Sequence, residues 1–359
     1  EFTAPFGPML FLSQLLAGAS ALLLLAPFLC VYFAARELLD FLLGGSIDAS
    51  ALAYWGLWAL GFELAGLIVN FIALLLSHKA AFHTEQNLKM AVLEHLSRLP
   101  MGYFEENSSG NLRKIIDENS KQTESYLAHQ LPDLVGAQVS MVAAALLMLA
   151  VDWRIGLPVL VLMMIGFAFQ MSMMGEETMN FMKRYQDAQE DMSHEAVEYV
   201  RGISVIKIFG QSVHSLRRFK EAIHAYRDDA LAYTMACKPG YVAFNTVVNS
   251  SFLALIPAAL IGMAAAADLE TFAQNFLFYL IFAPACAAML NKLMYMTNYK
   301  MQAVESMRRI DEILLTREQA EPREFKLPQC NDVRFDHVTF TYPTGEGPAI
   351  SDVSFLAKG

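Results

Sequence analysis

The chain has 359 residues, of which 55% are hydrophobic and only 17% are charged, and its formal net charge is −10. Soluble domains carry about 25% charged residues, and the mean hydropathy of +0.35 is high. The acidic balance argues against nucleic-acid binding, which needs a basic face for the phosphates. The four cysteines are far apart, so neither a disulfide framework nor a zinc motif is predicted: Cys30, Cys237, Cys286 and Cys330.

Six long windows are almost free of charged residues, and a bilayer is crossed by about 20 apolar residues in a helix. We predict membrane spans at 9–35, 49–78, 134–151, 155–175, 239–267 and 271–291. A large soluble core of buried helices is the alternative, but such cores rarely offer six windows of this kind. The predicted fold class is therefore an all-α membrane protein with six long helices.

The segments between these spans alternate between short and long. Only Arg36 and Arg154, of 26 Lys and Arg residues, fall on the side of the short segments. The positive-inside rule therefore places the long segments and the C-terminus in the cytoplasm. Trp55, Trp58 and Trp153 fall at the opposite boundary, which suits amphipathic indole rings. We expect a multi-pass protein of the cytoplasmic (inner) membrane.

The long segments 79–133 and 176–238 have helical spacing and few breakers. We expect the second and fourth spans to continue as helices into the cytoplasm, and the third and fifth to return from it. Breakers predict the turns at Asn107–Gly110 and at Arg201–Gly202. Two small inserted domains are the alternative, although the amphipathic pattern is poor in core residues.

The C-terminal part changes character. Residues 301–315 have a charged helical pattern, and 317–330 form a proline-containing linker. Apolar residues then alternate in 333–342 and in 349–356, which predicts two strands around a Pro- and Gly-rich turn.

Three stretches of sequence resemble a known family: Tyr103–Glu118 (YFEENSSGNLRKIIDE), His194–Gln211 (HEAVEYVRGISVIKIFGQ) and Val333–Gly359 (VRFDHVTFTYPTGEGPAISDVSFLAKG). With the spacing of the spans, they resemble a half-transporter of the ABC exporter family. The resemblance implies an exporter-type transmembrane domain over 1–316 and the first part of a nucleotide-binding domain over 331–359. Residues 22–40 and 128–137 are similar to the branch that includes siderophore transporters.

The resemblance implies how such a protein works. Two halves, identical or related, enclose a cavity in the lipid membrane, and their nucleotide-binding domains close on ATP and Mg²⁺. Short coupling helices carry that closure to the membrane and would contain, in this chain, Gly110, Asn111, Leu112, Arg113 and Asp117 in the first and His194, Glu195, Glu198, Arg201 and Gly202 in the second.

The resemblance also implies a nucleotide contact. Tyr342 would stack on adenine in the full-length protein, a contact that needs only a flat ring face. The alternative for Tyr342 is an ordinary aromatic residue on an edge strand.

The sequence departs from the family in one respect. It contains no G-x-x-x-x-G-K-[ST] loop to hold the β- and γ-phosphates, and the signature loop and Walker B acid are absent too. We therefore expect a part of a longer ATP-hydrolysing protein, with no catalytic residue, bound cofactor or ATP hydrolysis in this chain alone. An ATP-independent carrier or scaffold with an ABC-like membrane domain is the alternative.

Polar residues inside the spans are candidates for the substrate cavity. Glu63 is the one ionisable residue deep within a predicted span, where burial in lipid is costly. It either faces the cavity or is a protonated carboxyl bonded to an amide of a neighbouring helix. The amides of the spans either line the cavity or join helices: Gln14, Gln138, Asn245, Asn249 and Asn291.

The sequence leaves the cargo open. We expect a small or amphipathic solute moved by alternating access, with export favoured and siderophore-type import as the other direction. Met163 and Met164 belong to a methionine-rich stretch that either adapts to varied ligands or fills space toward lipid. The histidines lack metal-ligand spacing, so no metal site is predicted.

Overall fold

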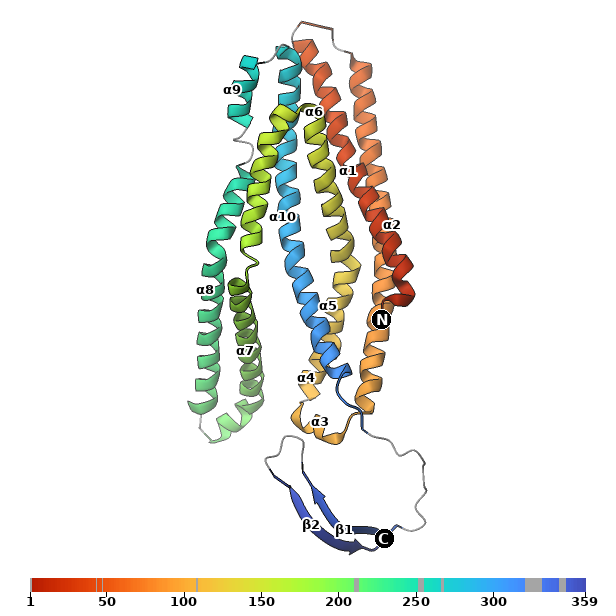
Figure 1. Ribbon diagram of the computed structural model, residues 1–359, viewed down its shortest axis with the longest axis vertical. Helices are drawn as coiled ribbons and strands as arrows, with labels where there is room; N and C mark the ends of the chain where they lie inside the picture. The colour runs from red at the N-terminus through yellow and green to blue at the C-terminus, as the bar shows by residue number, and fades with distance from the viewer. Residues whose placement is uncertain are drawn as a thin grey trace. The chain divides into compact units, whose positions relative to one another are not determined.

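The computed structural model describes residues 2–42, 44–46, 48–107, 109–209, 213–250, 255–265, 268–319, 331–341 and 347–359. It forms two compact units. The first unit contains Glu1–Leu10, Ser77–His129 and Tyr299–Gly359, and the second contains Phe11–Leu76 and Gln130–Asn298. Helices make up most of both units (Figure 1).

Six long helices dominate the described chain. They are α1 (Gly7–Leu42), α2 (Ala49–Ser97), α6 (Leu131–Ser172), α7 (Glu176–Phe209), α8 (Val213–Asn249) and α10 (Leu269–Leu314). Shorter helical elements are η1 (Ala4–Phe6), α3 (Met101–Glu106), α4 (Ser109–Lys114), α5 (Ser120–Ser125) and α9 (Leu255–Ala265). Two π-helical turns, η2 (Ile115–Asn119) and η3 (Tyr126–Gln130), flank α5.

Four helical stretches of the described chain are long and apolar enough to cross a membrane: Ala4–Leu42, Ala49–Ser97, Leu112–Ser172 and Leu269–Leu314. The third contains a break, because Asp152 has φ −158° and ψ 102°, and the chain of α6 reverses its direction there (Figure 1). The predicted spans 134–151 and 155–175 lie on either side of this break. The predicted span 239–267 covers the end of α8 and α9, and its residues 251–254 lie outside the described chain.

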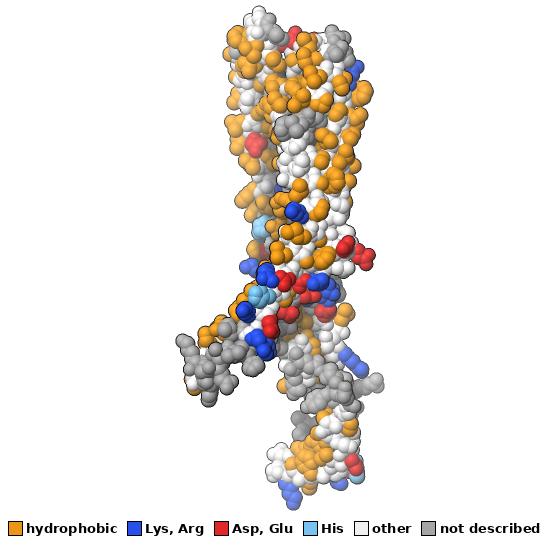
Figure 2. Space-filling model, turned by 90° about the vertical axis from the view of Figure 1, so that its left-hand side faces the viewer, with side chains coloured by type: hydrophobic (Ala, Val, Ile, Leu, Met, Phe, Trp, Pro, Cys, Tyr) orange, Lys and Arg blue, Asp and Glu red, His pale blue; other side chains and the backbone are white. Residues whose placement is uncertain are grey.

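The surfaces of these helices suit a bilayer. On α2, large apolar side chains are exposed along its length, among them Leu57 (70%), Ile68 (60%) and Phe71 (62%). Soluble monomers rarely expose apolar patches of this extent. In Figure 2, hydrophobic side chains cover the upper part of the face shown, and charged side chains gather lower down. These observations support a multi-pass membrane protein.

An aspartate caps the helical segment after each of three short turns in the second unit. Each carboxylate Oδ1 accepts a hydrogen bond from the backbone N–H two residues later: Asp48 from Ser50 at 2.9 Å, Asp152 from Arg154 at 3.0 Å and Asp268 from Glu270 at 3.0 Å. The pKa of Asp48 is lowered chiefly by the Ser50 hydroxyl, and the pKa of Asp268 by the Thr271 hydroxyl. The caps satisfy N–H groups that lack partners at a helix start.

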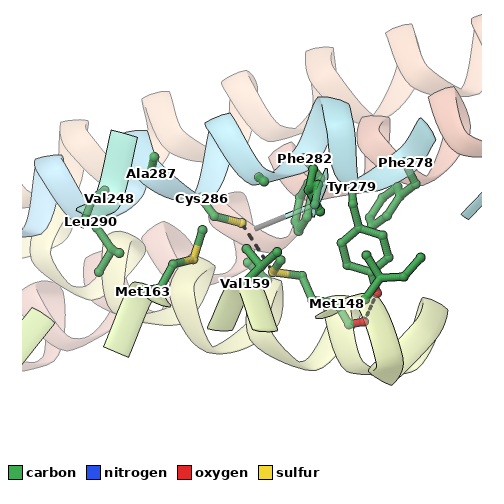
Figure 3. Packing of buried hydrophobic residues seen from close by; sticks show 14 of the residues in the cluster. Met148, Val159, Met163, Val248, Phe278, Tyr279, Phe282, Cys286, Ala287 and Leu290 are labelled. Carbon is green, nitrogen blue, oxygen red and sulfur yellow. Dashed lines mark hydrogen bonds between the residues drawn. The ribbon is translucent and has the colours of Figure 1, made fainter. Parts of the chain in front are cut away.

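Tyr279 of α10 holds the turn of α6 in place. Its side chain is fully buried, and its hydroxyl oxygen lies 2.7 Å from the carbonyl oxygen of Asp152. The hydroxyl also contacts the carbonyl oxygen of Met148 (Figure 3) and accepts a hydrogen bond from the Asp152 N–H at 3.1 Å. A Cβ at Gly156 would lie 2.6 Å from the Met148 carbonyl oxygen, so this tight turn requires glycine.

Each unit has its own apolar core. In the second unit, α6, α8, α9 and α10 supply buried residues such as Met148, Val159, Phe244, Leu255 and Phe282. In the first unit, α2, α4 and the C-terminal end of α10 pack through a smaller cluster: Leu88, Val92, Leu96, Leu99, Leu112, Ile310 and Ile313.

The predicted helical extension of the second span is confirmed, but that of the fourth span is interrupted, because α6 ends at Ser172 and α7 begins at Glu176. One predicted turn is also wrong. The 49-residue α2 continues far past residue 78, and Asn107 has extended φ/ψ between α3 and α4, as expected. However, α7 continues through Arg201 and Gly202 to Phe209. A glycine within a helix costs only about 1 kcal/mol, and the partner helix α8 lies alongside (Figure 1).

The two predicted strands form an antiparallel pair, β1 (Val333–Phe340) and β2 (Ile350–Ala357), with two register shifts. The rings of Phe335 and Phe355 stack at a centroid distance of 4.5 Å. At the irregular register, His337 and Asp352 have φ near +50°, and the His337 Nδ1 lies 2.6 Å from the Asp352 Oδ1.

The Tyr279 hydroxyl provides a test of the α6 turn. We expect Tyr279→Phe to destabilise the protein by about 1–3 kcal/mol, because it leaves buried backbone groups at Asp152 without a partner. The melting temperature in detergent should fall by roughly 2–4 °C per kcal/mol. The matched control is Tyr295→Phe on the same helix, whose ring is 52% exposed. Equal melting temperatures for the two variants would contradict this role.

Candidate functional site

The first predicted coupling segment, Gly110–Asp117, lies on α4 and η2 of the first unit. Leu112 anchors it, because its side chain is only 6% exposed and belongs to the cluster of α2 and α10 residues. Arg113, the next residue, is exposed, and its Nε lies 3.5 Å from the Asp117 Oδ2. A Cβ at Gly110 would meet open space, so this glycine is not required for packing. The segment therefore combines a fixed base with a charged, accessible face.

An ionic chain links this segment to α2 within the first unit. The Asp117 Oδ1 lies 3.8 Å from the Lys89 Nζ, which in turn lies 2.9 Å from the Glu85 Oε1. These side chains are partly exposed, and exposed ion pairs contribute only about 0–1 kcal/mol each. Leu112 thus supplies most of the attachment, and the charges orient the helix. The side chain of Asn111 lies outside the described residues.

The second predicted coupling segment lies on α7 of the second unit. His194 and Glu195 line a charged groove of about 540 Å³ between α7 and α8. Across this groove the Glu195 Oε2 lies 3.6 Å from the Arg218 Nε. Glu198 and Arg201 are both exposed on one face of α7, where the Arg201 Nη1 lies 3.5 Å from the Glu198 Oε1. The groove and this face present both charge signs, as a polar docking surface would.

Contacts between α7 and α8 make this helical hairpin stiff. The Arg184 Nη2 donates to the Asp229 Oδ1 at 2.6 Å, and Tyr185 stacks on Tyr233 at a centroid distance of 5.8 Å. The pKa of Tyr233 is raised to about 12, first by burial of the phenol, so the ring stays neutral at physiological pH. Tyr185 also meets the Tyr226 hydroxyl at 3.5 Å.

Two features of the first unit were not predicted from sequence. The end of α10 is tied to α2, because the His95 Nε2 lies 3.0 Å from the Thr316 carbonyl oxygen and its Nδ1 lies 3.2 Å from Glu318. The backbone N–H of Gln319 also donates to the Arg98 carbonyl oxygen at 2.8 Å. Backbone contacts of this kind leave no side-chain signal, and an isolated histidine in a helix is an ordinary feature of sequences.

The other unpredicted feature is a buried carboxyl. Glu124 of α5 is only 9% exposed, and its Oε1 lies 3.9 Å from the His78 Nδ1. The His78 ring meets the His129 ring edge-on at 4.5 Å. The sequence gives no hint that these residues from α2, α5 and η3 come together, since they are far apart along the chain.

The predicted cavity residues are distributed over five helices of the second unit. The Asn249 Nδ2 donates to the Asn245 Oδ1 at 2.5 Å and to its carbonyl oxygen at 2.9 Å, which places both amides on one face of α8. Asn291 bonds within its own helix, to the Ala287 carbonyl oxygen at 3.0 Å. Gln14 is half-buried and Gln138 is exposed.

Glu63 is exposed on α2, and no hydrogen bond or ion pair engages its carboxyl within the described residues. Of the predicted cavity residues, all of which the structure describes, only Asn245 and Asn249 are joined by a hydrogen bond. Tyr342 lies outside the described chain. Among the described residues, no group of three or more His, Cys, Asp or Glu side chains is arranged to hold a metal ion.

The structure thus defines a class: a multi-pass α-helical membrane domain whose helices extend into charged helical segments. Residues 14–283 match the model of the ABC transporter transmembrane region. The chain belongs to this family, which confirms the resemblance found in the sequence.

Individual relatives are similar over much of the chain. The mycobactin import ATP-binding/permease protein IrtA of Mycobacterium tuberculosis is 28% identical over 99% of this chain and 40% of its own length. Its counterpart from Mycolicibacterium smegmatis is 30% identical over 61% of this chain and 25% of its length. The ATP-dependent lipid A-core flippase of Photobacterium profundum is 22% identical over 89% of this chain and 54% of its length. The chain therefore spans only part of these relatives, and the first two agree with the similarity to a siderophore-related branch.

The tie between α10 and α2 can be tested by proteolysis. We expect His95→Ala to speed tryptic cleavage after the exposed Arg317 by about 2–10-fold, since one lost hydrogen bond contributes about 0.5–1.5 kcal/mol and cleavage follows the population of the open form. Asn87→Ala, an exposed position on α2, is the control. An unchanged cleavage rate in His95→Ala would show that His95 does not hold the end of α10.

Proposed function

We propose that this chain is the membrane domain of an ATP-driven transporter that moves a small or amphipathic solute across the cytoplasmic membrane by alternating access. The observation that carries the proposal is the family match over residues 14–283, joined to helical extensions that present charged surfaces on α4 and α7. An ATP-driven membrane domain needs such rigid docking segments, because force from a soluble domain must reach the bilayer. The six predicted spans, with the long segments cytoplasmic, belong to this proposal.

The proposed partner is a second half-transporter, identical or related, with nucleotide-binding domains that hold ATP and Mg²⁺. The pair β1–β2 would be the first part of such a domain, with residues 1–316 as the membrane domain and 317–330 as the linker. Support comes from the relatives, whose names describe ATP-binding/permease and ATP-dependent proteins. The hairpin is mostly exposed, as expected for strands that belong to a larger domain.

Coupling would run through three places described above. The Leu112 anchor holds α4 against α2 and α10, so a push on α4 reaches two long helices at once. The pair of α7 and α8 is stiffened by Arg184, Asp229 and stacked tyrosines. The tie at His95 fixes the start of the linker to α2. Rigid attachment at each point suits the transfer of domain closure to the membrane.

For direction, we propose import, because two relatives that are 28% and 30% identical are named as mycobactin import proteins. This reverses the preference for export that the sequence alone favoured. The lipid A-core flippases support a second candidate, the movement of a lipid-like solute between leaflets. Both candidates share an amphipathic cargo and an ATP-driven cycle.

Glu63 is the proposed cargo-facing charge. The carboxyl is exposed within the predicted span 49–78, where the other large exposed side chains of α2 are apolar, and a charge that faced lipid would be costly. A water-filled cavity between two halves would remove that cost. The amides Gln14, Gln138, Asn245, Asn249 and Asn291 are proposed as neighbours of the same cavity or as links between helices.

Inside-out membrane vesicles test the function and its direction together. The full-length protein with its nucleotide-binding domain is placed in vesicles preloaded with radiolabelled mycobactin, and MgATP is added outside. We expect ATP-dependent loss of label into the medium, which corresponds to import in the cell. Accumulation of external label would instead establish export. Movement driven by a proton gradient without nucleotide would overturn the proposal in favour of an ATP-independent carrier.

The charge of Glu63 can be removed without changing its shape. We expect Glu63→Gln to lower transport and cargo-stimulated ATP hydrolysis of the full-length protein by about 10-fold or more, because hydrogen bonds to charged groups contribute about 1.5–3 kcal/mol. Glu177→Gln, an exposed position at the start of α7, is the matched control. Wild-type transport by Glu63→Gln would exclude Glu63 from cargo binding.

A further inference from the structure

The second unit contains an apolar cavity of 230 Å³ between the two halves of α6 and α10. Its lining residues fall within the predicted spans 134–151, 155–175 and 271–291, so the cavity lies at the depth of the membrane. Every lining side chain is apolar or a thiol. Figure 3 shows Met148, Met163 and Cys286 projecting from α6 and α10 toward this common space.

The cavity has a buried floor and an accessible mouth. Met148, Cys286 and Leu290 form the floor and are at most 4% exposed. Val142 (62%) and Met164 (66%) stand at the mouth and belong to the two halves of α6. A molecule that enters can therefore leave one end outside, which suits a chain attached to a polar group.

The cavity's size and chemistry select a hydrocarbon occupant. A dry apolar cavity of about 150 Å³ takes up benzene in another protein, and this cavity is larger. Water is a poor occupant, because it would find no polar partner on these walls. An empty apolar cavity is destabilising in proportion to its volume, and alkyl chains are the surrounding solvent at this depth.

Methionine makes the walls adaptable. Five of the lining residues are methionines: Met141, Met148, Met163, Met164 and Met289. Their unbranched, polarisable side chains fill irregular gaps and change rotamer readily. The Met148 Sδ lies 3.9 Å from the Cys286 Sγ, and this contact forms part of the cavity floor. A wall of this kind fits a flexible chain better than one rigid shape.

We propose that this cavity is a binding site for a single alkyl chain. The chain belongs to a membrane phospholipid or to a single-chain amphiphile carried by the protein, and the hydrocarbon chemistry is the same for both. The site goes beyond the proposed function, because chain binding needs neither ATP nor a transport direction.

The test is photolabelling of the full-length protein in phosphatidylcholine nanodiscs. One sample contains a phosphatidylcholine with a diazirine in the middle of one acyl chain, and another contains a decyl maltoside with a diazirine in its chain. Labelled peptides are identified by mass spectrometry. We expect label on segments 141–148, 160–167 and 286–290 at least fivefold above the lipid-exposed segment 57–75 of α2.

Ala145→Phe fills the cavity from its wall and should cut this labelling at least fivefold. Ala288→Phe is the matched control, because Ala288 lies beside the lining residues Cys286 and Met289 on α10 but is exposed and does not line the cavity. This variant should retain labelling. If Ala145→Phe does not fold, Met164→Trp narrows the mouth from an exposed position and should act in the same direction.

The two probes separate the sources of the chain. Labelling by the phospholipid that excess decyl maltoside does not reduce assigns the site to a membrane lipid. Labelling by decyl maltoside that displaces the phospholipid assigns it to a carried amphiphile. Labelling no stronger than that of α2, or unaffected in Ala145→Phe and Met164→Trp, would overturn the proposal. ATP-driven transport by the same purified protein in sealed vesicles reports separately on the proposed function.

Discussion

The constraint on which this structure depends is that backbone N–H and C=O groups have no water to bond with inside a bilayer. Uninterrupted helices satisfy that constraint by themselves, which accounts for helices as long as the 49 residues of α2. The constraint is hardest to meet where a helix must end near the membrane. At three short turns, an aspartate carboxylate accepts a hydrogen bond from the backbone N–H two residues later: Asp48, Asp152 and Asp268. At the turn of α6, the Tyr279 hydroxyl also bonds the backbone N–H and C=O groups of Asp152.

In the first unit, and between α7 and α8, the helices are held by different forces. The first unit packs a small leucine and isoleucine cluster around Leu112 and Ile310, and α7 pairs with α8 through stacked tyrosines and the Arg184–Asp229 pair. Both charge signs therefore remain on accessible faces. Apolar anchoring fixes these segments and leaves their charges exposed, which would suit the proposed coupling to a nucleotide-binding domain.

Hydropathy and breakers predicted much of the fold, because span length and charge-free windows follow directly from the bilayer. The extent of α2, the turn at Asn107 and the two strands were all visible in the sequence. The turn predicted at Arg201–Gly202 was wrong, because pairing with α8 outweighs the weak helix propensity of one glycine. The tie of His95 to Thr316 and the meeting of Glu124 with His78 depend on packing between distant segments, which composition and periodicity do not encode. The same holds for the cavity behind Met163 and Met164.

The hydrogen bonds of Tyr279 make one end of the contact between α6 and α10 stronger than the other. At the α6 turn, α10 is fastened to both halves of α6 by a buried hydroxyl, and buried groups are costly to leave unpaired. Toward the other end of α10, the Lys292 Nζ meets the Asp133 Oδ1 at 2.9 Å with both side chains about half exposed, and such pairs contribute little. The contact between α6 and α10 is thus strongly held at the turn near Asp152 and weakly held at the Lys292–Asp133 ion pair. Breaking the Lys292–Asp133 pair therefore costs less free energy than breaking the hydrogen bonds of Tyr279 at the turn near Asp152.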